Sequence, residues 1–160
     1  MLVWPIGVGG SGNEGIAGEV KATIGSIGYV EVVYARQNRL PVAHLRNREG
    51  RFVSPLPFEI ASAATAVLDS IGGNPLDRQS GFRVSLANPP GAQAYPLSAF
   101  TFLLLDPDMA GRDRSRQMVE FLRWAYDDGA AIASSMGYVP LPTAAAERIL
   151  RQLDQAIPPE

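Results

Sequence analysis

The sequence predicts an α/β fold, because segments with helical periodicity alternate along the chain with segments typical of strands. Residues 26–34 are rich in β-branched and aromatic side chains, which favours a strand. Residues 95–105 hold a nearly continuous apolar run, which is typical of a strand buried on both faces. Residues 115–127 instead place Met118, Leu122 and Ala125 along one face of a helix.

The first half of the chain is predicted to run from a short strand through a glycine-rich loop into a helix. Pro5 cannot donate a ladder hydrogen bond, so residues 2–6 suit an edge strand or a strand start. The helix that follows contains Ile16, Ala17 and Val20 at helical spacing and ends at Gly25. Three further elements follow in this half: the strand 26–34, a short helical segment at 35–40, and a hairpin of residues 42–45 and 51–53. The last element is a helix at 58–68, whose apolar face holds Phe58, Ala61, Leu68 and either Ala64 or Thr65.

The second half is predicted to begin at the break of residues 72–75, which reads Gly-Gly-Asn-Pro. Residues 82–86 alternate like a half-buried strand, and residues 88–91 form a turn before the apolar run. The last helix covers residues 144–155, with Thr143 as its N-cap.

The composition excludes several classes of protein. The 160 residues are 46% hydrophobic and 19% charged, which is typical of a globular chain, and the net charge of −2 provides no broad basic field for nucleic acid. With no cysteine and His44 as the single histidine, thiolate chemistry and multi-imidazole metal sites are excluded. We therefore expect no metal and no cofactor.

The glycines from Gly7 to Gly12 match the G-x-G-x-x-G pattern of a dinucleotide-binding loop, and Glu31 follows about twenty residues later. This pattern keeps a nucleotide- or dinucleotide-binding enzyme domain open as an alternative. Pro5 in the first strand and the position of Glu31 inside the second strand both count against it. Ser11, Gly12 and Asn13 at the start of a helix form a candidate weak anion site, for which the competing interpretation is a plain capping turn.

No catalytic constellation is predicted, and the chain is not expected to be an enzyme. Paired carboxylates for acid–base chemistry need burial and a defined separation, whereas the acidic pairs here lie at turns and helix ends. The arginines around the start of the helix 115–127 suit a solvated helix start, and the aromatic residues of that helix suit packing. The residues considered for catalysis or binding, and interpreted instead as structural, are Asp106, Asp108, Asp127, Asp128, Arg112, Arg114, Arg116, His44, Trp124 and Tyr126.

Seven strings, in order along the chain, resemble segments of the phosphate-binding proteins of phosphate ABC transporters, a family of periplasmic solute-binding proteins. The first reads Trp-Pro-Ile-Gly-Val-Gly-Gly-Ser-Gly-Asn from Trp4, and only residues 52–94 match loosely. The strings are residues 4–17, 25–31, 34–40, 95–98, 101–102, 121–126 and 137–142. The resemblance therefore covers nearly the whole chain.

The resemblance implies a two-lobed, hinged receptor of the periplasmic-binding-protein type II fold that closes on one phosphate ion. In that family the ion is held by backbone N–H groups, hydroxyls, an arginine and a proton-accepting aspartate, a set that suits a partly protonated oxyanion. The second-lobe ligands lie in an Arg-x-x-x-Ser-Gly-Thr loop upstream of the Trp-Pro string, and this sequence begins at Met1, just before Trp4. No phosphate ligand is therefore carried over to any residue.

We accordingly expect a truncated chain, the C-terminal portion of such a receptor. Residues 1–94 are expected to supply the C-terminal share of the second lobe, and residues 95–160 that of the first lobe. The intact receptor is expected in the periplasm or at the cell surface, delivering inorganic phosphate to a membrane permease, although Met1 to Pro5 show no signal-peptide pattern. No nucleic-acid partner is expected.

Overall fold

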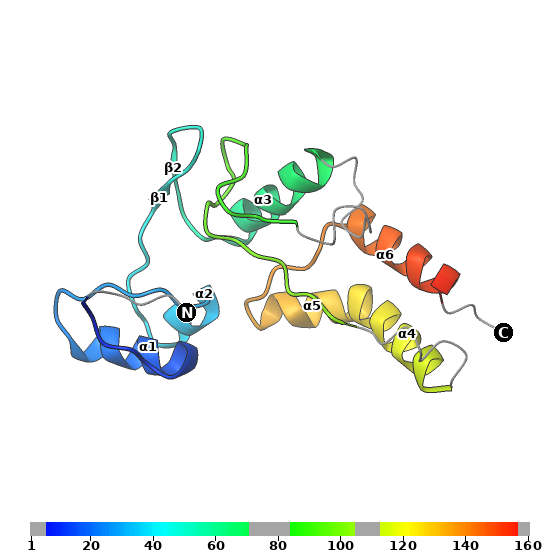
Figure 1. Cartoon of the computed structure of the whole chain (residues 1–160), viewed down its shortest axis with the longest axis horizontal. Helices are drawn as coiled ribbons and strands as arrows, with labels where there is room; N and C mark the ends of the chain where they lie inside the picture. Colours follow the sequence, from blue (N-terminus) through cyan, green and yellow to red (C-terminus); the bar gives the residue numbers. More distant parts are fainter. Residues whose placement is uncertain (1–5, 71–83, 105–112, 157–160) are drawn as a thin grey trace. The chain divides into compact units, whose positions relative to one another are not determined.

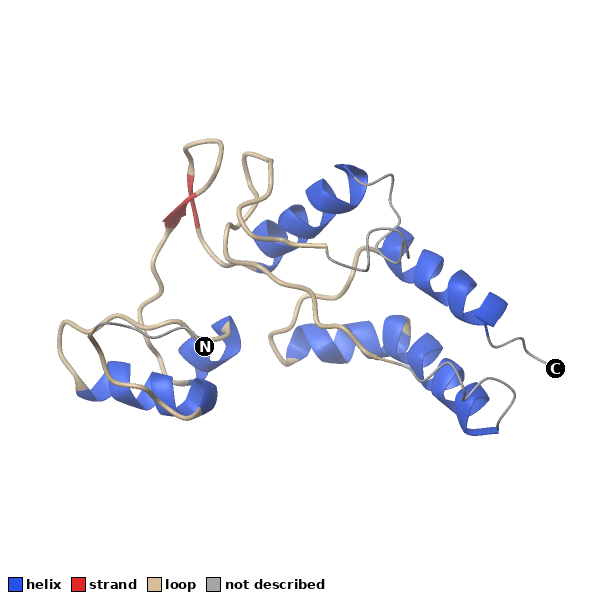
Figure 2. Cartoon of the chain, viewed as in Figure 1, coloured by secondary structure: helices blue, strands red, loops and turns tan. Residues whose placement is uncertain are grey.

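The computed structural model describes residues 6–70, 84–104 and 113–156 (Figure 1). The chain divides into two compact units, Met1–Ala43 and His44–Glu160. Helices make up most of the regular structure, and the strands are short (Figure 2). The predicted mixture of helices and strands is confirmed, with fewer and shorter strands among the described residues than the sequence predicts.

The first unit contains α1 (Gly12–Ala22) and α2 (Val32–Gln37). The predicted helix at residues 16–21 is confirmed as α1, and Ala17 within it is fully buried. The chain leaves α1 through a turn in which the Ser26 N–H donates to the Thr23 carbonyl and Gly25 takes a φ of +80°. Gly25 thus lies in the turn after the helix, close to its expected position.

The ending of α2 follows the Schellman pattern. The Leu40 N–H donates to the Ala35 carbonyl at 2.9 Å, the Arg39 N–H donates to the Arg36 carbonyl at 3.1 Å, and Arg39 has a φ of +55°. An arginine here takes the left-handed conformation that usually falls to glycine, because two hydrogen bonds hold the backbone in place.

The predicted strand at residues 26–34 is wrong. Residues 26–31 have no regular structure, and the helix α2 begins at Val32, so the helical step predicted at residues 35–40 starts earlier than expected. A strand needs a hydrogen-bonded neighbour, and the described residues of the first unit contain none. Ile27 and Tyr29 are consequently exposed. The strand predicted at residues 2–6 lies outside the described residues apart from Ile6, which is not in a strand.

The second unit opens with the predicted hairpin, which is confirmed. The strands β1 (Leu45–Arg46) and β2 (Phe52–Val53) pair antiparallel, with Leu45 opposite Val53 and Arg46 opposite Phe52. Because side chains alternate along a strand, buried Val53 faces the protein and exposed Phe52 faces solvent.

Asn47 fastens this hairpin to a loop more than forty residues further along the chain. Its side chain is 95% buried, and its Nδ2 lies 3.2 Å from the Gly91 carbonyl, 3.0 Å from that of Ala92 and 3.3 Å from that of Ala94. Its Oδ1 accepts hydrogen bonds from the N–H groups of Glu49 and Arg51. One amide thus satisfies backbone groups both of the hairpin turn and of the loop at residues 91–94.

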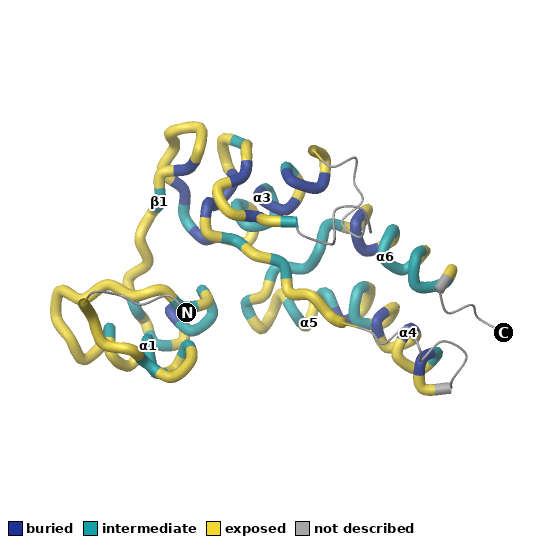
Figure 3. Tube along the Cα trace, viewed as in Figure 1, coloured by how far each residue is buried: buried dark blue, intermediate teal, exposed yellow. Residues whose placement is uncertain are grey.

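The helix α3 (Pro57–Ser70) confirms the helix predicted at residues 58–68, with proline as its first residue. The predicted apolar face is confirmed at Ala64 and Leu68, which are buried together with Ala63 and Val67, whereas Phe58 is exposed. Ala64 and Val67 form the core cluster with Leu86, and Val84 and Phe100 pack against it. Figure 3 shows buried residues interspersed with exposed ones along α3.

The two later strands are wrong as predicted within the described residues. Residues 84–86 and 98–104 have no regular structure, and the two segments are joined by a single antiparallel bridge between Ala87 and Leu97. The turn predicted at residues 88–91 lies slightly later, at residues 92–93, where the Ala94 N–H donates to the Gly91 carbonyl at 3.1 Å. A central strand needs neighbours on both edges, and the described residues supply one bridge, so Leu103 and Leu104 are exposed.

Three helices complete the second unit: α4 (Asp113–Tyr126), α5 (Asp128–Ser135) and α6 (Thr143–Ala156). The first and last of these confirm predicted helices, with α6 beginning at Thr143 rather than after it. The helix α4 packs against both of the others, and Arg123 joins it to Asp154 of α6 by an ion pair of 2.6 Å. None of the helices in the described ranges is long and apolar enough to cross a membrane.

Candidate anion site at the glycine-rich loop

The candidate residues Ser11, Gly12 and Asn13 form the entry to α1. Ser11 is the N-cap, with an extended backbone, and its carbonyl accepts the Gly15 N–H at 3.1 Å. Its hydroxyl makes no capping hydrogen bond. The first N–H groups of a helix have no intrahelical acceptor, so this end of α1 has the donors and the positive dipole end that an anion prefers.

Two neighbouring groups limit what this helix end can bind. The Asn13 side-chain oxygen accepts the Glu31 N–H at 2.9 Å, so it connects α1 to the start of α2. The Glu14 carboxylate lies beside Gly12, 3.3 Å from the position of a Cβ on that glycine. A carboxylate in the first turn itself complements the helix dipole and repels a second anion. Anion binding here stays a prediction that no contact in the structure tests.

One glycine of this loop, Gly10, has a packing reason that the sequence pattern did not reveal. A Cβ on Gly10 would lie 2.6 Å from the Gly15 carbonyl carbon and from the Ile16 nitrogen, so the loop and α1 touch backbone to backbone. A Cβ on Gly28 would lie 2.6 Å from a methyl group of Val20. Gly9, between the loop glycines, has nothing within 4 Å. Close packing of the loop on its own helix therefore requires Gly10 in particular.

The dinucleotide alternative finds no support in this geometry. A dinucleotide fold places its loop between a strand of a parallel sheet and the following helix, whereas the one sheet among the described residues is an antiparallel pair in the other unit. Glu31, the counterpart of the ribose-binding acid, is the N-cap of α2, with its own N–H bonded to Asn13.

The other residues weighed from the sequence are not assembled into a reactive cluster. Asp127 is the N-cap of α5 and Asp128 its first residue, His44 is exposed, and Trp124 packs against the Phe121 ring with centroids 5.8 Å apart. Within the described residues no group of acidic side chains and histidine could hold a metal ion. Burial raises the pKa of Tyr95 and of Tyr126, which keeps both phenols neutral. Asp106, Asp108 and Arg112 lie outside the described residues.

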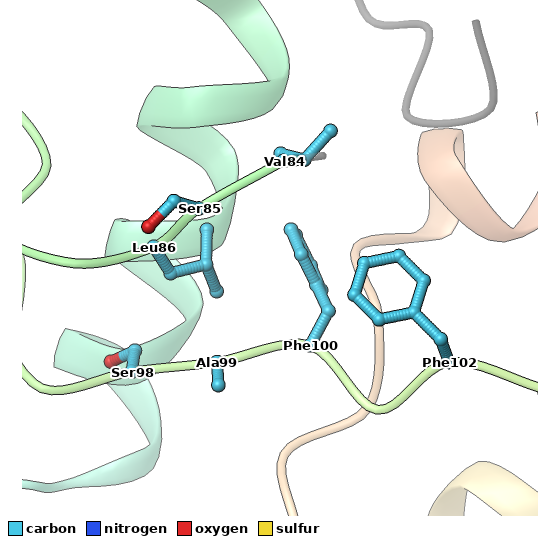
Figure 4. Close-up of a pocket in the computed structure, with 7 residues that line it drawn as sticks. All are labelled: Val84, Ser85, Leu86, Ser98, Ala99, Phe100 and Phe102. Atoms are coloured by element: carbon cyan, nitrogen blue, oxygen red, sulfur yellow. The ribbon is translucent and has the colours of Figure 1, made fainter. Parts of the chain in front are cut away.

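A shallow pocket that the sequence pattern does not indicate lies between residues 84–86 and 98–102 of the second unit (Figure 4). Leu86 and Phe100 point toward each other across it, and Phe100 meets Phe102 edge to face at 6.2 Å. Its volume is about 310 Å³, and it is lined by Val84, Ser85, Leu86, Ser98, Ala99, Phe100 and Phe102. Two hydroxyls among apolar groups cannot offset the desolvation of a phosphate ion, so the pocket is not a phosphate site.

Comparison with known proteins reveals relatives that share one name. The phosphate-binding protein PstS of Pasteurella multocida is 37% identical over 150 residues, which cover 93% of this chain. Its namesake in Xylella fastidiosa strain 9a5c is 36% identical over 139 residues, and that of Haemophilus influenzae is 34% identical over 149 residues. No family model matches the sequence.

The matched stretches are nearly the whole of this chain but only part of each relative. The chain spans 41% of the Pasteurella protein, 36% of the Xylella protein and 42% of the Haemophilus protein. Similarity at this level over some 140 to 150 residues is what the seven ordered strings predict. The chain is thus a relative, along about nine tenths of its own length, of the phosphate-binding proteins named PstS, and the predicted resemblance is confirmed.

Proposed function

We propose that this chain is part of a receptor that captures inorganic phosphate and delivers it to the membrane permease of an ABC importer. The observation that carries the proposal is the sequence similarity to PstS proteins across 87–93% of the chain. Such a receptor binds and releases its ligand without changing it, so the proposal assigns no enzymatic activity. It places the receptor in the periplasm or at the cell surface.

The proposal further places this chain in the C-terminal part of a two-lobed type II periplasmic-binding-protein fold. Residues 1–94 would belong to the second lobe and residues 95–160 to the first. The exposed leucines 103 and 104, on an extended segment with one bridge, support this placement, since such a segment suits a sheet whose other strands come from elsewhere in a receptor. The division between the compact units falls after Ala43 in the sequence, well before residue 94, so the lobe boundary rests on the resemblance alone.

In this proposal the phosphate ligands lie outside the 160 residues. The sequence contains no Arg-x-x-x-Ser-Gly-Thr string, and the relatives are more than twice as long as the stretch that matches. The helix end at Ser11 has the Glu14 carboxylate beside it, which disfavours a doubly charged anion at that position.

We expect calorimetric titration of the purified chain with phosphate to give no binding heat, and likewise with sulfate and with NADH. A circular dichroism spectrum with helical minima, recorded on the same sample, ensures that the chain is folded. Saturable heat with phosphate but not sulfate would contradict the placement of the ligands outside this chain. Heat with NADH alone would instead contradict the receptor proposal.

A further inference from the structure

The turn of the β1–β2 hairpin concentrates positive charge in an acidic chain. Residues 45–53 hold Arg46, Arg48 and Arg51 against one acid, Glu49. They therefore carry a net charge of +2, which leaves −4 on the other residues of a chain whose total is −2. All three arginines are exposed, and within the described ranges none of their guanidinium groups takes part in an ion pair or a hydrogen bond.

An exposed aromatic side chain lies on the same hairpin as these arginines. Phe52 is 70% exposed and lies directly across the ladder from Arg46, whose Nη2 folds back to within 3.4 Å of the Cβ position of Gly50. Arginine and aromatic residues are the types most enriched at the energetic centres of protein interfaces. A solubilising surface needs charge but gains nothing from an exposed phenylalanine.

The hairpin is also held firmly. Buried Asn47 ties its turn to the carbonyls of Gly91, Ala92 and Ala94, and the hairpin and this loop lie side by side in Figure 1. Gly50, with a φ of +79°, closes the turn through an N–H bond to the Asn47 carbonyl. A fixed backbone lowers the entropy lost when a partner binds.

We propose that Arg46, Arg48, Arg51 and Phe52, hereafter the basic hairpin surface, dock an acidic segment of a partner protein that also presents an apolar side chain. Each carboxylate can accept two parallel hydrogen bonds from an arginine guanidinium group, and the apolar side chain of the partner covers Phe52. An extended anionic surface such as a membrane or a nucleic acid fits less well, because the remaining −4 charge of the chain opposes it. This inference goes beyond phosphate binding and does not depend on it.

The test uses the whole chain and a fluorescein-labelled peptide of about ten residues, mostly glutamate with interspersed leucine, followed by fluorescence anisotropy. We expect saturable binding that weakens about tenfold in the triple variant Arg46→Gln, Arg48→Gln, Arg51→Gln, and about fivefold in Phe52→Ser. The matched control removes three exposed positive charges elsewhere, Lys21→Gln, Arg114→Gln and Arg151→Gln, and should retain most of the affinity.

Three outcomes would overturn the proposal. The first is no binding of the peptide, and the second is an equal loss of affinity in the matched control, which would show a general charge effect. The third is tighter binding of phosphatidylglycerol vesicles or a single-stranded oligonucleotide with the same dependence on the hairpin arginines. Thermal unfolding followed by circular dichroism should give the same midpoint for all variants, since every substituted side chain is exposed.

Discussion

The variant Asn47→Asp will lower the free energy of unfolding of the second unit by about 3 to 5 kcal/mol at neutral pH. The substitution replaces a donor by a carboxylate oxygen that faces the carbonyls of Gly91, Ala92 and Ala94, at a position that is 95% buried. One carboxylate oxygen then faces three carbonyl acceptors with no proton to donate, while the other keeps the N–H groups of Glu49 and Arg51. Urea unfolding monitored by circular dichroism measures the change.

The pH dependence of this variant has a definite sign. Burial and the facing carbonyls raise the pKa of the introduced carboxyl in the folded state above its unfolded value near 3.9. Protonation therefore favours the folded state, and the deficit relative to the parent chain should shrink as the pH falls through the raised folded pKa. The exposed variant Asn88→Asp, which adds the same charge nearby, should change stability by less than about 0.5 kcal/mol. Equal unfolding midpoints for the two variants would contradict this account of Asn47.

The variant Gly10→Ala will destabilise the first unit by about 2 kcal/mol or more, because the added methyl group meets backbone atoms that cannot rotate away. Its Cβ would lie 2.6 Å from the Gly15 carbonyl carbon and from the Ile16 nitrogen. The loop must then separate from the start of α1, and hydrogen–deuterium exchange of the α1 amides should become faster.

Gly9→Ala is the matched control for this prediction. Gly9 has no atom within 4 Å of its Cβ position and no positive φ, so the substitution should change stability by less than about 0.5 kcal/mol. If both variants exchanged equally fast, the loop glycines would serve a purpose other than packing.

Periodicity and proline positions were sufficient to predict α3, α4 and α6. The helices α3, α4 and α6 each have an apolar repeat, and α3 and α6 also have prolines at their entry, so local sequence determines where they form. The helix α5 was missed because Asp127, Asp128 and Gly129 were interpreted as the end of one helix. Gly129 is in fact buried at the start of the next helix, where a Cβ would lie 3.3 Å from the Trp124 carbonyl oxygen.

The strands could not be predicted in the same way, because a strand depends on residues distant in sequence. The residues 26–34 and 95–104 have strand composition, yet within the described residues they lack the neighbours that would complete a ladder. The hairpin at Leu45 and Val53 formed because its two halves are adjacent in the chain. The bonds from Asn47 span 44 to 47 residues, and no local pattern predicts them.

The candidate anion site was likewise predictable only where it depends on neighbouring residues in the sequence. The helix start at Ser11, Gly12 and Asn13 was predicted from glycine and capping residues, and the structure places it there. The bond from the Glu31 N–H to Asn13, and the contact between Gly10 and Gly15, depend on how the loop folds back, which the sequence pattern does not encode.

The central claim, that this chain is part of a phosphate receptor, is tested most directly by a chimera. In the Pasteurella multocida PstS protein, the 150-residue matched segment is replaced by the corresponding residues of this chain, and phosphate and sulfate are titrated by calorimetry. We predict a folded chimera that binds phosphate and not sulfate. A chimera that unfolds cooperatively, as the parent does, but binds neither anion would contradict the claim.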